Sequence, residues 1–336
     1  MKAVVLRDIG SLEKLSYEDV AFPIVKSGEA VVRVKAAALN HRDWWIVQGL
    51  YAKIKVPVIL GSDGAGEVVN VGDPKDEGFV GKQVVIHPSL SWGDNSRAQS
   101  KDFRILGMPD NGTLAEYVTV PLSNIFEKPE YLTDEESAAL PLGGLTAYRA
   151  LFVQGKLQEK DVVLITGIGG GVASLAMQMA LAAGAIVMVT SGHEEKIQRA
   201  VKAGIAFGSN YNDEDFFKKL TAAAESYGGI DLIIDSAGGK GFGDLMALIK
   251  PGGRIVNFGA TAGNPESFDL RKMFWKQITL QGSTMGTHED FGNMIAFFRL
   301  HRIKPLIDKV FLLKDVVNAF QRMKDGIQFG KIVLKP

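Results

Sequence analysis

The chain contains no cysteine among its 336 residues. This composition excludes disulfide bonds, a thiol nucleophile and any metal held by thiolates. Long hydrophobic runs are also missing, since no apolar stretch approaches the ~20 residues that span a bilayer. Neither sign of charge dominates, because 38 Lys and Arg residues balance 38 Asp and Glu residues and no basic block occurs. We therefore expect neither membranes nor nucleic acids as partners.

The N-terminus has no apolar segment typical of a signal peptide, because residues 1–7 lead directly into a strand pattern. The cytoplasm is the expected compartment. A length of 336 residues predicts two domains. In the first part of the chain, short alternating strands such as residues 30–35 and 81–86 are broken by glycine and proline turns. This pattern indicates a compact β domain.

After Thr133, which begins a helix with acids in its first turn, strands alternate with amphipathic helices. Residues 230–235 and 253–258 are expected to be strands of this second, doubly wound domain. The tail predicts helices at residues 291–301 and 316–323 and a final strand at 331–334, which we expect to rejoin the first domain. The predicted fold class is α/β, with residues 1–140 and 285–336 in the β-rich domain and residues 141–284 in the doubly wound domain.

A strand, a glycine turn, an apolar helix and a second strand follow one another between Val163 and Ser191. This order is typical of a site for the pyrophosphate of a dinucleotide. Gly167 permits a tight turn, and Gly169 and Gly170 let the backbone approach phosphate. Gly171 and Val172 then open a helix whose free N–H groups and positive dipole end attract the anion.

The second strand of this unit ends without an acid, on Thr190, Ser191, Gly192 and His193. A carboxylate about twenty residues after the glycines would bind the ribose hydroxyls of NAD. Its absence leaves room for a 2′-phosphate, which Ser191, Lys196 and Tyr211 are placed to bind. We therefore predict NADPH as the cofactor. Glu194 and Glu195 are interpreted as acids that favour the start of the next helix, and ribose binding by either one is the alternative.

Five segments, in this order, resemble one known family: Ala38-Leu-Asn-His-Arg-Asp-Trp, Leu60-Gly-Ser-Asp-Gly-Ala-Gly-Glu-Val-Val, Gly112-Thr-Leu-Ala-Glu-Tyr-Val, Leu145-Thr-Ala-Tyr-Arg-Ala-Leu and Gly330-Lys-Ile-Val-Leu. They resemble the medium-chain dehydrogenase/reductase superfamily over essentially the whole chain. The resemblance implies a GroES-like catalytic domain interrupted by a Rossmann domain. Within the superfamily, the chain looks like a zinc-free member of the quinone oxidoreductase type.

The metal ligands of the zinc alcohol dehydrogenases are missing at the matching positions. Asn40 stands where those enzymes have a first cysteine, Ser62 and Asp63 where they have histidine and glutamate, and the third ligand falls near Leu142. Only Asp63 among these ligates zinc readily. Residues 88–101 resemble the structural-zinc lobe without its cysteines, with Trp92 at the first of them, so packing and hydrogen bonds must hold it. A metal site made by His41, His87 and Asp63 is a minor alternative to structural roles for both histidines.

Without zinc to polarise a carbonyl, acceptors that need little electrophilic help are favoured, namely a quinone or an alkene conjugated to a carbonyl. Asn40, Asp43 and Tyr51 match polar active-site positions of the quinone reductases and are the predicted catalytic residues, with Arg42 as an extra donor. Asp43 is equally interpreted as a buried acid that fixes its loop. The predicted cofactor-binding residues are Thr146, Gly167, Gly169, Gly170, Gly171, Val172, Ser191, Lys196, Tyr211, Phe258, Gly259, Ala260, Ser283 and Met285.

The prediction is an NADPH-dependent quinone or conjugated-carbonyl reductase that acts on a small electrophilic molecule and forms a homodimer or homotetramer. One alternative keeps the superfamily but is an alcohol/aldehyde or enone (alkenal) reductase. Another is a protein that binds NADPH without turnover, as a sensor or structural protein, because no residue is an unambiguous acid or base.

Overall fold

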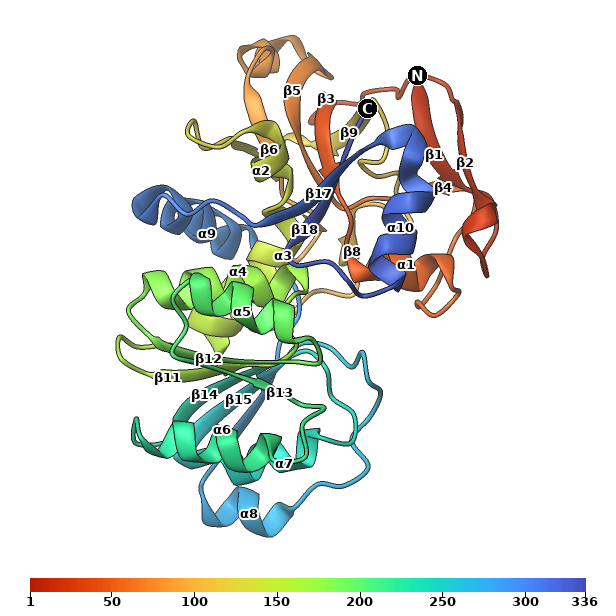
Figure 1. Cartoon of the computed structure of the whole chain (residues 1–336). Coiled ribbons are helices and arrows are strands. Elements are labelled where there is room, and N and C mark those ends of the chain that lie inside the picture. The colour runs from red at the N-terminus through yellow and green to blue at the C-terminus, as the bar shows by residue number, and fades with distance from the viewer. The chain divides into compact units, whose positions relative to one another are not determined.

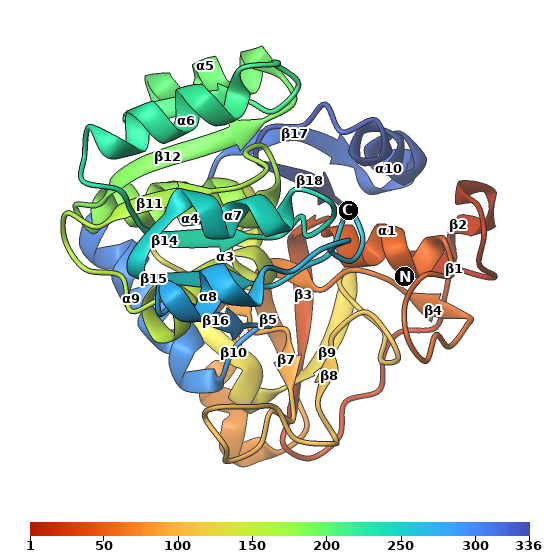
Figure 2. The same ribbon diagram turned by 90° about the horizontal axis from the view of Figure 1, so that it is seen from below.

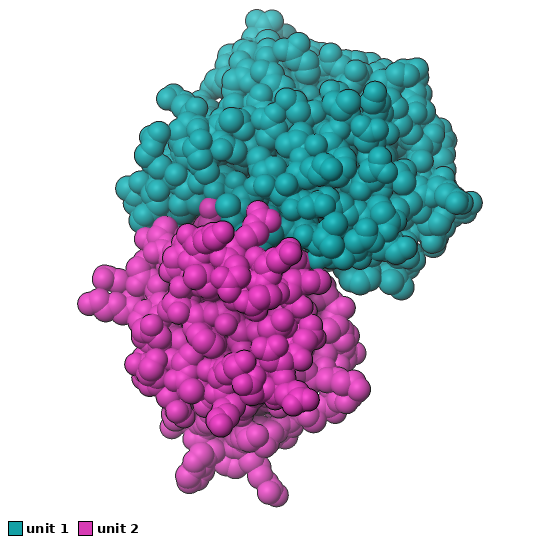
Figure 3. All heavy atoms as spheres, in the orientation of Figure 1, with its two compact units in different colours: residues 1–145, 286–336 teal, residues 146–285 magenta.

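The computed structural model describes residues 1–336, which form two compact units. Met1–Leu145 and Gly286–Pro336 make up unit 1, and Thr146–Met285 makes up unit 2 (Figure 3). The chain thus returns to its first unit after completing the second. No helix is long and apolar enough to cross a membrane.

Unit 1 is built mainly from strands. They are β1 (Lys2–Leu6), β2 (Leu15–Asp19), β3 (Glu29–Ala38), β4 (Val58–Ile59), β5 (Asp63–Val71), β6 (Gln83–Ile86), β7 (Ser89–Leu90), β8 (Arg104–Ile105), β9 (Tyr117–Pro121), β10 (Ile125–Glu127), β17 (Ile307–Leu312) and β18 (Lys331–Lys335). Its helices are α1 (His41–Val47), α2 (Asp134–Ala138), α3 (Pro141–Tyr148, which crosses into unit 2), α9 (His288–His301) and α10 (Val316–Lys324). Short 3-10 helices are η1 (Leu12–Lys14), η2 (Pro74–Phe79), η3 (Leu122–Asn124) and η5 (Leu313–Asp315).

The main sheet of unit 1 has the strand order β10-β6-β5-β3-β18-β17, and β9 also pairs with β3 (Figures 1 and 2). Apolar side chains on one face of it, including those of Val32, Val34 and Ile332, join a large core with α1 and α10. The other face is lined by small residues, among them Ala38, Ala65 and Val333, against which α2 packs. Small side chains are needed there because the helix lies directly on the strands.

Unit 2 alternates strands with helices. The strands are β11 (Val162–Ile165), β12 (Ile186–Ser191), β13 (Phe207–Asn210), β14 (Ile230–Asp235), β15 (Ile249–Asn257) and β16 (Thr279–Gly282). The helices are α4 (Gly171–Ala182), α5 (Glu194–Lys202), α6 (Phe216–Glu225), α7 (Phe242–Leu248) and α8 (Leu270–Trp275), and a π-helical segment, η4 (Arg149–Gln154), precedes β11.

All six strands of unit 2 run parallel in the order β13-β12-β11-β14-β15-β16. Figure 1 shows α4 and α5 on one face of this sheet and α6, α7 and α8 on the other. Both faces are therefore covered, which explains why the central strands read as continuous apolar runs. In this doubly wound order the connections leave β11 and β14 in opposite directions, so ligands bind beside the carboxyl ends of these two strands.

Candidate active site and cofactor site

Three strand ends bring polar residues together at one edge of the main sheet of unit 1. Ala38, near the end of β3, pairs with Asp63 at the start of β5 and with Val333 in β18. Since residues two apart on a strand share a face, Asn40 and Lys331 lie on the same side as this row. The register therefore gathers Asn40, Asp63 and Lys331 beside the small-residue face that α2 covers.

The ammonium group of Lys331 is the centre of this cluster. Only 2% of the residue is exposed, and its Nζ donates to Oδ1 of Asn40 at 2.6 Å and to Oδ2 of Asp63 at 2.8 Å. A lysine is almost never this deeply buried unless it is paired. The carboxylate of Asp63 is fully buried and supplies the opposite charge.

The second oxygen of Asp63, Oδ1, accepts the backbone N–H of Leu142 at 2.7 Å. This N–H belongs to the first turn of α3, where backbone donors have no partner within the helix and the dipole favours an anion. Asp63 is thus satisfied on both oxygens by groups far from it in sequence, and it links the starts of β5, β18 and α3.

The side chain of Asn40 is only half satisfied. Its Oδ1 accepts from Lys331, while its Nδ2 is buried and has no hydrogen-bond partner. A buried donor left unpaired costs about 1 to 3 kcal/mol, so the amide of Asn40 keeps an unused donor that an added acceptor could satisfy.

Asp43 lies beside Asn40 and is fully buried. Its Oδ2 accepts the backbone N–H of Asn40 at 2.9 Å, and its Oδ1 accepts that of Gly61 at 3.3 Å. Burial raises the pKa of Asp43, an effect opposed by the neighbouring Arg42 and by the hydrogen bond from Asn40. The acid fixes the two loops that carry Asn40 and Asp63, which favours a positioning role over direct chemistry.

Arg42 binds protein oxygens. Its guanidinium donates to Oγ of Ser62 and to the carbonyls of Leu106 and Met108, each at 3.0 Å. The half-buried ring of Tyr51 lies against the guanidinium, 5.1 Å from ring centre to carbon. Arg42 therefore ties α1 to the segment around residue 106. The structure brings Asn40 and Asp43 together, and it places Tyr51 on Arg42.

His87 follows β6 in unit 1 and is buried among His288, Phe126 and Phe291. Its Nδ1 faces the side-chain nitrogen of Asn124 at 3.3 Å, and its Nε2 has no partner. Burial, helped by His288, lowers the pKa of His87 to about 3. The minor alternative of a metal held by His41, His87 and Asp63 is wrong for this structure, which has no group of three His, Asp or Glu side chains placed to hold a metal ion.

The cysteine-free lobe is held by one buried tryptophan. Trp92 is 6% exposed, donates from Nε1 to the carbonyl of Asn95 at 3.0 Å, and meets the ring of Phe103 edge-on at 5.3 Å. Ser100 closes the lobe by donating its backbone N–H to Trp92 and its hydroxyl to Ser91. Packing of the tryptophan ring and these hydrogen bonds thus hold a lobe that has no cysteines.

The glycine turn of unit 2 has the geometry expected of a phosphate cradle. Gly167 and Gly169 adopt φ values of +66° and +124°, which other residues rarely tolerate. A Cβ placed on Gly167 would meet nothing within 4 Å, so the space above it is open. Gly170 is the N-cap of α4, and Gly171 and Val172 form its first turn, whose N–H groups are free for an anion.

At the end of β12, Ser191 is 3% exposed and its Oγ accepts the N–H of His193 at 3.1 Å. Tyr211 packs over Gly192 so closely that a Cβ there would lie 2.7 Å from the tyrosine hydroxyl oxygen. The half-buried Lys196 follows in the first turns of α5. Glu194 accepts from Gln198 one turn later on the exposed face of that helix, at 2.7 Å.

A buried carboxylate that the sequence analysis missed ties three strand ends of unit 2. Asp235, at the end of β14, accepts from Oγ1 of Thr166 at 2.7 Å, from the N–H of Gly238 at 3.0 Å and from Nδ2 of Asn257 at 2.8 Å. The sequence signal that could have found Asp235 is an acid at the end of an otherwise largely apolar strand. This network supports the segment Phe258, Gly259 and Ala260, whose first N–H binds the carbonyl of Asp235.

The remaining predicted cofactor residues lie at the two ends of unit 2. Thr146 and Met285 are its first and last residues, and the threonine hydroxyl contacts the Met285 sulfur at 3.9 Å. Met285 has a φ of +42°, and Oγ of Ser283 is buried without a partner. A strained backbone and an orphaned hydroxyl are both typical of a ligand site.

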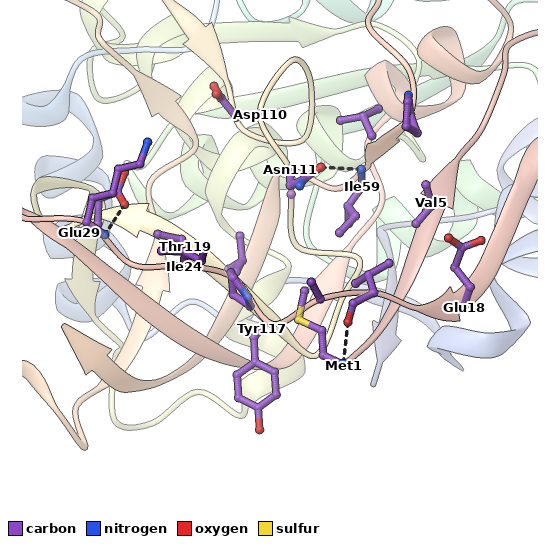
Figure 4. A pocket seen from close by; sticks show the side chains of 18 of the residues that line it. Met1, Val5, Glu18, Ile24, Glu29, Ile59, Asp110, Asn111, Tyr117 and Thr119 are labelled. Carbon is purple, nitrogen blue, oxygen red and sulfur yellow. Dashed lines mark hydrogen bonds between the residues drawn. The ribbon is translucent and has the colours of Figure 1, made fainter. Parts of the chain in front are cut away.

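A hollow of about 600 Å³ lies elsewhere in unit 1 (Figure 4). Its labelled polar groups are largely engaged with protein, for example Asn111 with the N–H of Ile59 and the Met1 ammonium with the carbonyl of Val20. None of the predicted catalytic residues lines it. The hollow is therefore not the candidate active site.

Comparisons with known proteins match both parts of this arrangement. Residues 26–130 match the alcohol dehydrogenase GroES-like domain family, and residues 171–299 match the zinc-binding dehydrogenase family. A zinc-type alcohol dehydrogenase-like protein, YogA, of Leptosphaeria maculans is 33% identical, with 94% of this chain and 93% of the relative covered. The chain belongs to the medium-chain dehydrogenase/reductase superfamily.

Two further relatives in this superfamily are named for an activity. A solved NAD-dependent alcohol dehydrogenase superposes with a TM-score of 0.94, at 34% identity and over 100% of both chains. The acryloyl-coenzyme A reductase of Sulfurisphaera tokodaii is 28% identical, also over 100% of both chains. The fold prediction is confirmed, as the chain combines a GroES-like N-terminal domain with a parallel six-stranded Rossmann sheet. It is an NAD(P)-dependent oxidoreductase of this superfamily.

Zinc does not fit the residues at the positions that bind it in zinc-containing members of the superfamily. The amide of Asn40, the hydroxyl of Ser62 and the backbone of Leu142 are poor zinc ligands. Asp63 is the one suitable ligand, and both of its oxygens already accept hydrogen bonds, from Lys331 and from the N–H of Leu142. Lys331 was missed as a site residue, although a lone lysine that opens a buried apolar strand indicates a buried counter-charge.

Proposed function

We propose that the chain is an NADPH-dependent reductase that transfers hydride to a quinone or conjugated carbonyl without zinc. The observation that carries the proposal is the buried cluster in which Lys331 pairs with Asn40 and Asp63, which stand at two of the positions of the missing metal ligands. It supplies an unpaired amide donor where an acceptor oxygen would gain negative charge, but no Lewis acid for simple alcohol oxidation.

The cofactor fits the residues of unit 2. The turn from Gly167 to Gly170 and the first turn of α4 would hold its pyrophosphate, and the segment from Phe258 to Ala260 would adjoin its nicotinamide. When bound, the cofactor supplies the hydride. We propose Thr146, Ser283 and Met285 as further contacts, supported by the buried hydroxyl of Ser283 that lacks a partner.

NADPH is the proposed form because no acid stands at the end of β12. The hydroxyl of Ser191 accepts the N–H of His193, which leaves its own hydrogen to donate to a 2′-phosphate. Tyr211 lies next to it across Gly192, and Lys196 is close in sequence. The exposed Glu194 is engaged with Gln198, which supports its role at the helix start rather than at the ribose.

A relative supports the choice of acceptor. It is an acryloyl-coenzyme A reductase, and acryloyl-coenzyme A carries an alkene conjugated to a thioester carbonyl. In such acceptors, hydride adds to the distal carbon and the electron pair moves to the oxygen. Asn40 is the proposed donor to that oxygen, and Asp43 positions Asn40. Tyr51 is a second proposed donor. Tyr51→Phe tests this role because it keeps the ring and removes the hydroxyl.

We also propose a homodimer or homotetramer. The edge of β16 is unpaired, and α8, which precedes it, exposes Leu270, Phe274 and Trp275 by 66%, 66% and 81%. An open strand edge beside exposed apolar side chains is typical of a self-association surface. Sedimentation at several concentrations tests this, and a monomer throughout would contradict it.

The test of function is NADPH consumption with a panel of quinones, enones, alkenals and aldehydes, and NADP⁺ reduction with simple alcohols, alongside cofactor binding by fluorescence. We expect turnover with quinones or enones well above that with simple aldehydes. Turnover confined to alcohols and aldehydes would favour the alcohol dehydrogenase alternative, whose support is the likeness to an NAD-dependent alcohol dehydrogenase. Tight NADPH binding with no turnover on any compound would favour the sensor.

A further inference from the structure

The orientation of the Asn40 amide is fixed by its neighbour. The nitrogen and oxygen of an asparagine amide can exchange places by rotation, and only the hydrogen-bond network decides between them. Lys331 is an ammonium with three donors and no acceptor. Because Nζ lies 2.6 Å from Oδ1, rotating the amide would press its NH₂ group against another donor.

Lys331 is itself held in place by charge. Asp63 pairs with it at 2.8 Å, both residues are buried, and the second oxygen of Asp63 is anchored on the N–H of Leu142. The amide thus rests on a chain of contacts that runs from α3 through Asp63 and Lys331. These contacts end at Nδ2 of Asn40, which has no partner in the protein even though the residue is buried, with only 7% exposed.

We propose that Lys331, held by Asp63, is a positioning residue that locks the Asn40 amide with its N–H groups toward the acceptor oxygen of the substrate. The ammonium acts through Asn40. The inference rests on the proposed function. A bound reduced nicotinamide would supply hydride to the distal alkene carbon. The C=C π pair would shift to the bond beside the carbonyl and the C=O π pair to oxygen. Nδ2 of Asn40 would donate to that enolate oxygen until solvent supplies a proton to the adjacent carbon.

The direct test is Asn40→Asp, which is nearly isosteric and keeps an oxygen toward Lys331 but removes the donor. We expect the variant to fold and to bind NADPH like the wild type. Its kcat with an enone should fall about 100-fold or more, the loss typical of one oxyanion donor. A variant that keeps the wild-type kcat would overturn the proposal and leave the proposed function intact.

The positioning role is tested separately. Lys331→Met alone strands a buried carboxylate, so we pair it with Asp63→Asn, which removes both charges and spares the fold the unpaired ion. The double variant should lose kcat while its KM for NADPH stays constant, because the amide is no longer held. Asn40→Ala, which removes the amide without adding a charge, should then lower kcat far less in the double variant than in the wild type. A folded double variant with unchanged kcat, or fully additive losses, would show that the pair is only structural.

Binding gives a readout that needs no turnover. 4-Nitrophenolate carries a charged oxygen like that of an enolate, and its absorbance reports ionisation. In the presence of NADP⁺ we expect the wild type to bind the phenolate and Asn40→Asp to bind it at least ten-fold more weakly. If the wild type binds the phenolate but reduces no acceptor, the proposed function fails while the role of Asn40 stands. Equal binding by both proteins would overturn that role.

Discussion

A few side chains at the end of β12 decide which cofactor the chain prefers. One or two charge-assisted hydrogen bonds to a 2′-phosphate, each contributing about 1.5 to 3 kcal/mol, predict a preference for NADPH of about ten- to several-hundred-fold. Ser191→Asp places a carboxylate there, which should repel the phosphate and accept from the ribose hydroxyls of NADH. Titration of both cofactors should therefore show that the preference falls or reverses.

Lys196→Ala should weaken NADPH binding and leave NADH binding nearly unchanged, since only the phosphate needs the cation. The matched control is Lys202→Ala, which removes an exposed lysine from the last turn of the same helix. Equal affinities of the wild type for both cofactors, or a Ser191→Asp variant that still prefers NADPH, would indicate that Glu194 or Glu195 reads the ribose.

His87 makes stability depend on pH. Its pKa in the folded protein, about 3, lies below the ordinary value of 6.5, so the unfolded chain binds a proton more readily. The contribution of neutral His87 is complete above pH 6.5 and is lost as the pH falls toward 3. His87→Phe, a ring of similar size beside Phe126 and Phe291, should flatten the dependence of the unfolding free energy between these limits by up to about 1.4 kcal/mol per pH unit.

The control for His87 is His301→Phe, which removes an exposed imidazole at the end of α9. Urea unfolding at several pH values measures all three proteins. If His87→Phe and the wild type lose stability in parallel on acidification, the buried imidazole does not stay neutral and this account of it is wrong.

Sequence reasoning at the residue scale succeeded where a local pattern carries the chemistry. The glycines at 167, 169 and 170 needed only their own spacing to be placed at a helix start. Lys331 could not be placed in the same way, because its partner Asn40 is 291 residues away and the contact exists only once β18 lies beside β3. The unpaired Nδ2 of Asn40 is likewise visible only in three dimensions.

At the scale of helices and strands, local patterns could again be predicted from the sequence and long-range pairings could not. The order of the parallel sheet follows from right-handed crossovers between alternating strands and helices, so a doubly wound unit was predictable. The antiparallel order β10-β6-β5-β3-β18-β17 was not, since each pairing joins distant segments and the short strands have no unique partner in sequence.

The lobe of residues 88–101 has no cysteine, so packing and hydrogen bonds must hold it. Trp92→Ala removes the buried ring and should open the lobe, with a loss of about 3 kcal/mol in local stability. Trp92→Phe keeps a ring for Phe103 and loses only the bond to Asn95, about 1 kcal/mol. Trypsin cleavage at Arg97 and Lys101 should accelerate strongly in the first variant and slightly in the second.

Chelator and reductant provide the control for the lobe, because the wild type has no thiol and neither agent should change its cleavage rate. Cleavage of Trp92→Ala at the wild-type rate would show that other contacts hold the lobe.

At the scale of the whole molecule, the chain belongs to a superfamily that includes zinc enzymes, but an amide and a carboxylate bound by a buried ammonium stand at two of its metal-ligand positions. We propose reduction of activated acceptors because such groups can stabilise a developing oxyanion but cannot polarise an alcohol as a metal does.

The most direct test measures metal content and turnover on the same sample. Purified protein is treated with a strong chelator, its zinc is quantified, and NADPH oxidation with an enone or quinone is recorded before and after treatment. We predict that the protein holds no stoichiometric zinc and that the chelator leaves kcat unchanged. About one zinc per chain, with activity that disappears on its removal and returns when zinc is added, would contradict it.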